Sequence, residues 1–341
     1  MKLRLSVLAA VSILGRVQGQ DDLNVGKDPS TVAVKGSPQK KFFIPLPETS
    51  VFYDALREIN SGTEWNSNNL RVRGDMVSLI SIAIGFDETV VWYDHWEDGT
   101  LKITRNTLLA SIVFSRGRYS GYESDLSAPN ATSTEIWGDG IASNGCRPDV
   151  PNCQDADDLL NAGDSFVIES QVPVPRDASN WETAGGIKFD GGDSVSSSFP
   201  ITITRGAYAQ YPGSLLAGAC EVFDTSMMWG TMFEAPVGQD FNVETQAFDY
   251  TRFFVMSGSD NNELTLPNGT TMVLNTGESS SFAVNQGDQL LSKSPIQVTL
   301  LTGDPGSTYE LRWFTLFPLK DWATAYQAAV GDSFARKFTA V

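Results

Sequence analysis

Residues 77–84 read VSLISIAI and residues 89–93 read TVVWY, and these two runs decide the fold class. Both are rich in β-branched and aromatic residues, and the Gly85-Phe86-Asp87-Glu88 segment between them has the composition of a turn. Because many short strands separated by frequent turns are typical of sandwiches, we expect an all-β protein with one or two antiparallel β-sandwich domains and a few short helices. The other expected strands are 40–46, 165–169, 200–204, 215–223, 252–257, 280–284, 296–302 and 309–317.

Helical patterns are confined to two segments, residues 51–59 after Ser50 and residues 321–327 after Pro318. Between LTLP and TTMVL, the pair Asn268-Gly269 predicts a β-hairpin with a type I′ turn. Asn268 should therefore lie at an exposed hairpin tip.

The chain begins with the features of a secretory signal peptide. A basic start is followed by the short apolar run LSVLAAVSIL and then by small residues before a cleavage site at Gly19. We therefore expect a secreted protein, extracellular or at the cell surface. The expected organisation is a signal peptide at 1–19, a flexible N-terminus at 20–39, a first β domain at 40–206, a second at 207–330 and a tail at 331–341.

The chain carries a formal net charge of −17. Such an acidic protein repels nucleic acid and anionic lipid, so neither is an expected partner. The apolar run in the signal peptide is too short to span a bilayer, and no other stretch approaches the roughly 18 apolar residues that a membrane helix needs, so we expect no membrane span.

Cysteines and sequons are in keeping with secretion. Cys146 and Cys153 flank a short loop rich in Pro, Asp and Asn, and in an oxidising compartment we expect them to form a disulfide. Cys220 lies in an apolar run and is expected to be a buried small hydrophobic residue. Asn130 and Asn268 each begin an N-glycosylation sequon.

An acidic and aromatic segment at 90–99, VVWYDHWEDG, is the densest group of candidate functional residues. Asp94, Glu97 and Asp98 could supply the carboxylates of a calcium site on a tight turn. Carboxylates beside tryptophans could instead bind or hydrolyse a glycan, or could form an acidic strand end whose aromatic residues pack in the core. A second acidic region, residues 149–164, could be a calcium site or a solvated face.

Several stretches together resemble secreted bacterial and fungal proteins that carry a YDHWEDG signature. They are FFIPLPE at 42–48, VVWYDHWEDG at 90–99, STEIWGDG at 133–140, FDGGD at 189–193, ITRGAY at 203–208, GSLLAGACEVFDT at 213–225 and LLTGDPGSTYELRWFTLFP at 300–318. Residues 207–330 also resemble the N-terminal domain of the IgGFc-binding-protein group. The resemblance implies a β fold and supplies no mechanism. It also implies a C-terminus that continues beyond residue 341.

The signature in that family continues directly into Tyr-Glu, whereas here residues 100–121 intervene before Tyr122-Glu123. This segment contains four cations and no acid, unlike the rest of the chain. We interpret it as an insertion, such as a translated intron. A genuine basic hairpin is the alternative.

These observations favour a non-enzymatic extracellular surface or matrix interaction module, stabilised by calcium in one version of the hypothesis. Its partner would be an extracellular protein or a glycan. The alternative is a secreted carbohydrate-active protein, a lectin or a glycoside hydrolase, that uses the YDHWEDG face.

Overall fold

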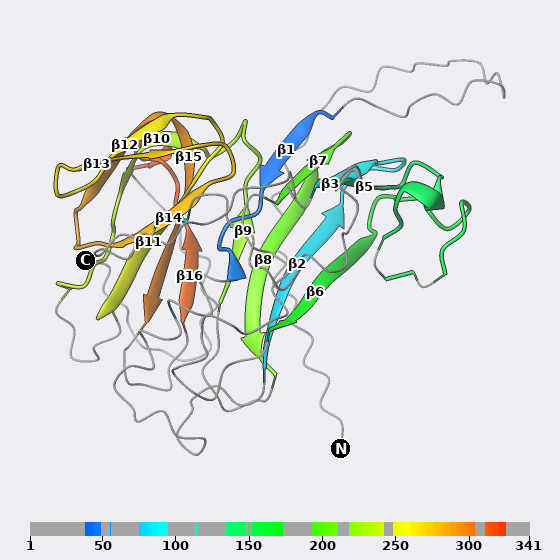
Figure 1. Cartoon of the computed structure of the whole chain (residues 1–341), viewed down its shortest axis with the longest axis horizontal. Coiled ribbons are helices and arrows are strands. Elements are labelled where there is room, and N and C mark those ends of the chain that lie inside the picture. Colours follow the sequence, from blue (N-terminus) through cyan, green and yellow to red (C-terminus); the bar gives the residue numbers. More distant parts are fainter. Residues whose placement is uncertain are drawn as a thin grey trace. The chain divides into compact units, whose positions relative to one another are not determined.

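The computed structural model confirms an all-β protein built from antiparallel sheets (Figure 1). It describes residues 38–48, 55, 75–94, 113–114, 134–147, 149–150, 152–172, 193–210, 218–241, 248–303 and 311–324. Within these residues no helix is long and apolar enough to cross a membrane.

The first half forms two four-stranded sheets. One sheet has the order β1 (Lys40–Phe43), β7 (Ser194–Ser197), β3 (Val91–Asp94) and β5 (Thr134–Trp137). The other has the order β6 (Ser165–Val172), β2 (Met76–Ile84), β8 (Ile201–Ala209) and β9 (Ala219–Val222).

One apolar core joins these two sheets into a sandwich, because strands of both sheets contribute to it. Alternate residues of β2 point inward, as the pleat of a strand requires, and they include Ser78 as well as Ile80 and Ile82. Trp137 lies at the centre of the core, stacked on Tyr93 and edge-on to Phe166. The buried members are Phe42, Ile44, Ile80, Ile82, Ile84, Val91, Tyr93, Trp137, Leu160, Phe166, Val195, Ile201, Ile203 and Val222.

The two ends of this sandwich differ. At one end, which we call the turn end, short turns connect β2 to β3 and β7 to β8. At the other end, which we call the cluster end, β1, β3, β6 and β8 terminate and β2, β5, β7 and β9 begin.

The second half is one larger sheet that curves around its own apolar core. Its strands are β10 (Gly230–Glu234), β11 (Tyr250–Ser257), β12 (Asn262–Thr265), β13 (Thr271–Leu274), β14 (Ser279–Ala283), β15 (Gln289–Gly303) and β16 (Arg312–Thr315). The long strand β15 is central: its first part pairs with β10 and β12, and its second part pairs with β11 and β16. Pro295 lies between these parts, where the absence of a backbone N–H costs the fewest hydrogen bonds to neighbouring strands.

Several expected boundaries shift. The domain boundary expected at 206 falls inside β8, and β9 completes the same sheet, so the first sandwich extends beyond residue 220. The helix expected at 321–327 is replaced in the described part by a 3-10 turn at Leu319–Asp321, after which Trp322 is extended. The helix expected at 51–59 lies outside the described residues, apart from residue 55.

Of the predicted insertion, the structure describes only β4 (Val113–Phe114), which pairs with Ser279 and Ser280 at the edge of β14. The rest of residues 100–121 lies outside the described residues, so the insertion hypothesis stays a prediction.

Candidate functional site

Arg205 is fully buried inside the first sandwich. It occupies an inward position of β8, in line with the core residues Ile201 and Ile203. Its guanidinium donates hydrogen bonds to three backbone carbonyls: Nη1 to Leu79 (3.1 Å) and Gly206 (2.9 Å), and Nη2 to Leu46 (3.1 Å). Arg205 therefore ties the segment after β1 to the opposite sheet.

The segment that receives this bond has an unusual backbone. Leu46 stands between two prolines and has a φ of 60°, a left-handed conformation that a branched residue rarely adopts. Leu46 is also buried, and two residues later Glu48 is fully buried. The strained turn is held in place because its carbonyl accepts a charged donor and its side chain packs in the interior.

Burial lowers the pKa of Arg205, since desolvation penalises the guanidinium charge, while the negative charge of Glu48 raises it again. Weaker contributions that raise this pKa come from Cys220, Tyr93 and Asp193. An arginine keeps its proton under these conditions, so the interior holds a cation compensated by carboxylates.

Tyr93 is hydrogen-bonded to a second buried carboxylate near Arg205, that of Asp193. Its Oη donates a 2.6 Å hydrogen bond to Oδ2 of Asp193, which is 1% exposed and directly precedes β7. The Tyr93 ring is fixed by stacking on Trp137, with centroids 5.5 Å apart and planes 13° apart. The phenol is thus held rigidly against the carboxylate.

Cys220 completes the group, which we call the charged cluster: Glu48, Tyr93, Asp193, Arg205 and Cys220. Cys220 is the direct cross-strand neighbour of Arg205 and is buried as a free thiol. Burial raises its pKa to about 11, against smaller lowering effects from the nearby Thr315 and Thr299 side chains and from the Arg205 charge. This thiol is therefore protonated near neutral pH and is not an activated nucleophile.

Each member of the charged cluster comes from a different stretch among those that carry the family resemblance. Stretches far apart in the chain thus meet at the cluster end of the sandwich. The candidate residues named from the sequence did not include Glu48, Asp193 or Arg205. One signal was present, because Arg205 falls at an inward position of an alternating strand, where a charge needs a partner.

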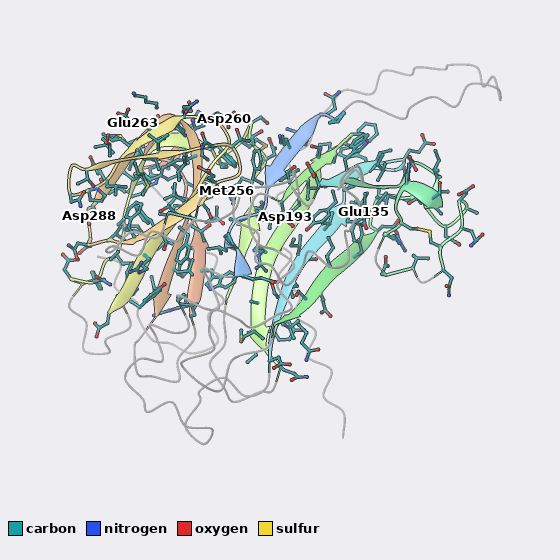
Figure 2. All side chains as sticks on the ribbon, in the orientation of Figure 1. Glu135, Asp193, Met256, Asp260, Glu263 and Asp288 are labelled. Carbon is teal, nitrogen blue, oxygen red and sulfur yellow. A yellow bond between two sulfur atoms is a disulfide. The ribbon has the colours of Figure 1, made fainter. Side chains whose placement is uncertain are left out.

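Glu135 lies beside the charged cluster, directly opposite Tyr93 on the edge strand β5, and Figure 2 labels it together with Asp193. It keeps contact with solvent, yet burial of its carboxylate raises its pKa. Glu135 is thus both perturbed and accessible, as are Tyr208 and Glu221 in the other sheet of the sandwich.

The predicted calcium ligands are only partly described. Asp94 ends β3 at the cluster end and is half-buried, whereas Glu97, Asp98 and His95 lie outside the described residues. In the described part of the chain, no group of three or more His, Cys, Asp or Glu residues is arranged to hold a metal ion.

In the second acidic region the carboxylates stabilise turns. Asp158 is 1% exposed and accepts hydrogen bonds from the backbone N–H groups of Gly138 (2.7 Å), Gly140 (3.1 Å) and Ile141 (3.3 Å). Asp155 accepts one from Ala142. Burial raises the pKa of Asp158, and its hydrogen bonds with those backbone groups oppose the rise. Asp158 is therefore a buried structural acceptor, whereas Asp149, Asp155 and Asp157 are exposed, as the reading of a solvated face predicts.

The disulfide between Cys146 and Cys153 is confirmed, as is the buried free Cys220. The bridge closes the turn-rich segment that follows η2 (Ala142–Asn144).

The predicted hairpin at Asn268 is present, but its turn is of another type. Gly269 has a φ of 81°, whereas Asn268 does not have positive φ, which a type I′ turn requires. The N–H of Gly269 bonds to the carbonyl of Leu266, and Pro267 occupies the position where its fixed φ suits a type I turn. The loop is thus a type I turn followed by a glycine bulge. Asn268 is exposed, and Asn130 lies outside the described residues.

Comparisons of the chain with family models, with curated proteins and with solved structures find no match. The resemblance to the YDHWEDG proteins and to the IgGFc-binding group therefore stays a prediction.

Proposed function

We propose that this protein is a non-enzymatic extracellular interaction module. The observation that carries the proposal is the state of Arg205, whose guanidinium is fully buried and donates to three carbonyls of the scaffold. Its buried carboxylate neighbours neutralise it, and Cys220 is a protonated thiol. Groups that could do chemistry are thus used to hold two sheets together.

Two features support an extracellular location. The Cys146–Cys153 disulfide is of the kind that persists in oxidising compartments. Asn268 stands at an exposed hairpin tip, where its Oδ1 accepts hydrogen bonds from the N–H (3.0 Å) and the hydroxyl (2.7 Å) of Thr270. A glycan on its Nδ2 would extend into solvent.

The alternative function, glycoside hydrolysis, is favoured by one observation. Glu135 has a raised pKa and remains accessible beside the Tyr93–Asp193 pair, as a general acid would. Only the hydrolase would turn over a substrate, and that turnover should require Glu135.

The test incubates the wild-type protein and the Glu135→Gln variant with a panel of soluble β- and α-linked polysaccharides and measures the release of reducing ends. The proposal expects no release above a blank from either protein. Release by the wild type that is lost in Glu135→Gln, and kept in a control variant of the exposed Glu263, would overturn it in favour of a hydrolase.

Secretion is tested by expression in a eukaryotic secretory host. We expect a mature chain that begins at Gln20 and a glycan on Asn268 that an endoglycosidase removes. The Asn268→Gln variant should lose the mass of that glycan, whether or not Asn130 is also glycosylated. Retention in the cell with an intact N-terminus would contradict the extracellular proposal.

A further inference from the structure

Two phenylalanine rings lie side by side and exposed at the turn end of the first sandwich. Phe86, in the turn between β2 and β3, is 50% exposed, and Phe199, in the turn between β7 and β8, is 43% exposed. Their centroids are 5.8 Å apart and their planes are 32° apart. Two neighbouring rings at this exposure form a small aromatic platform rather than scattered surface residues.

The turns that carry the rings are locked together. The hydroxyl of Thr89 donates to the carbonyl of Phe86 (2.6 Å), and the hydroxyl of Ser197 donates to that of Phe199 (2.7 Å). Val90 and Ser198 exchange two further bonds: Val90 N–H to Ser198 Oγ (2.9 Å), and Ser198 N–H to the carbonyl of Val90 (3.0 Å). The platform is therefore preorganised, so a ligand would not bear the entropic cost of ordering it.

The described rim of the platform is acidic. Asp87 and Glu88 follow Phe86 directly and are exposed, and Asp87 is oriented by accepting a bond from the N–H of Ala162 (2.9 Å). Of the cations described near this end, Arg147 is already paired with Asp149 (3.0 Å) and Asp164 (3.4 Å), and Lys40 is paired with Asp224 (3.3 Å). Lys41, opposite Ser196, lies over the ring of Phe43 (4.7 Å to the centroid). An anionic ligand would be repelled, whereas a ligand with hydroxyl donors would find acceptors here.

We infer that the Phe86–Phe199 platform binds the pyranose rings of a neutral glycan. The C–H groups on the face of a sugar carry small positive charges and match the negative faces of aromatic rings, while the hydroxyls at the edge of the sugar can donate to Asp87 and Glu88. A neutral sugar satisfies both features of the site, the uncharged rings and the acceptor-rich rim. The inference rests on the proposed interaction function and gives it a ligand class and a place.

The experiment titrates the full-length protein with cellohexaose and with laminarihexaose, as neutral β-glucan probes, by calorimetry and by aromatic NMR shifts. We expect saturable binding of at least one probe, with a loss of about three- to tenfold in affinity for each of Phe86→Ala and Phe199→Ala. The matched control is Phe314→Ala, which removes a ring that is 49% exposed on β16 and should leave binding unchanged.

Three outcomes would overturn the inference: no saturable binding of either glucan at millimolar concentration, an equal loss in Phe314→Ala, or saturable binding only of a lysine-containing aliphatic peptide. The last outcome would mark the platform as a protein contact. The titration measures binding only. The non-enzymatic proposal is tested separately by the assay of reducing-end release, so the two can fail independently.

Discussion

The phenol of Tyr93 and the carboxylate of Asp193 are one hundred positions apart in the chain and form a 2.6 Å hydrogen bond in the interior of the first sandwich. The bond joins the YDHWEDG stretch to the FDGGD stretch, so a single hydrogen bond links two segments that are distant in the sequence. A buried bond to an ionised acceptor is among the stronger ones in proteins.

Tyr93→Phe should therefore destabilise the protein by about 1–3 kcal/mol, because Asp193 loses a donor without regaining water. The measurement is the urea midpoint at constant slope. Tyr208→Phe is the control. Its side chain is 41% exposed, so removal of its hydroxyl should lower the free energy of unfolding by about 0.5 kcal/mol or less. Equal midpoints for the two variants would show that the Tyr93 bond contributes nothing.

Arg205→Met should cost about 3–5 kcal/mol, because it leaves the fully buried Glu48 without its compensating cation. Arg205→Met combined with Glu48→Met should cost clearly less than the sum of the two single variants. Arg205→Lys should not rescue, because an ammonium cannot reproduce three bonds to three separated carbonyls. Additive effects in the double-mutant cycle would contradict the pairing.

The Cys220 thiol should be unreactive in the native protein. With a pKa raised to about 11, it carries almost no thiolate at pH 8 and is also buried. Titration with a thiol reagent should give no thiol in buffer and one thiol per chain in denaturant without reductant. Three thiols in denaturant would mean that Cys146 and Cys153 are not bridged.

Replacing both Cys146 and Cys153 by Ala should lower stability by about 2–3 kcal/mol, as expected for the loss of a short cross-linked loop. The urea midpoint of the double variant, compared with that of the wild type under non-reducing conditions, measures this. A wild type whose midpoint is unaffected by reductant would contradict the prediction.

Three acids should contribute a rise in stability as the pH falls from neutral towards the acidic range. Burial raises the pKa of Glu135, Asp158 and Glu221, so each binds its proton more tightly when folded than when unfolded. The native state is therefore favoured increasingly as the pH falls through the raised values towards the ordinary ones. The gain in Tm between pH 7 and pH 5 should shrink in Glu135→Gln and in Glu221→Gln. An unchanged gain in both variants would contradict this origin.

The fold class could be predicted because runs such as 77–84 and 89–93 are rich in β-branched and aromatic residues and are separated by a turn. The first part of β15 was missed because QLLSKSP has no β-branched or aromatic residue and contains Pro295, and pairing on both sides holds it extended all the same. Likewise, Asn268-Gly269 predicted the hairpin, but Pro267 before it determined the turn type.

The charged cluster could not be predicted from the sequence because its members are single polar residues in five separate stretches. Only the pairing of β8 with β9 places Arg205 beside Cys220, and only the start of β7 places Asp193 within reach of Tyr93. The disulfide, by contrast, was local and therefore predictable.

The strand β15 has a consequence for how the second half of the chain unfolds. It bonds to β10 and β12 along one part and to β11 and β16 along the other, so no neighbouring strand can detach both parts of it alone. Amide protons in the buried stretch from Ile296 to Gly303 should exchange with deuterium only when this whole half opens, and their exchange rates then measure its global unfolding free energy.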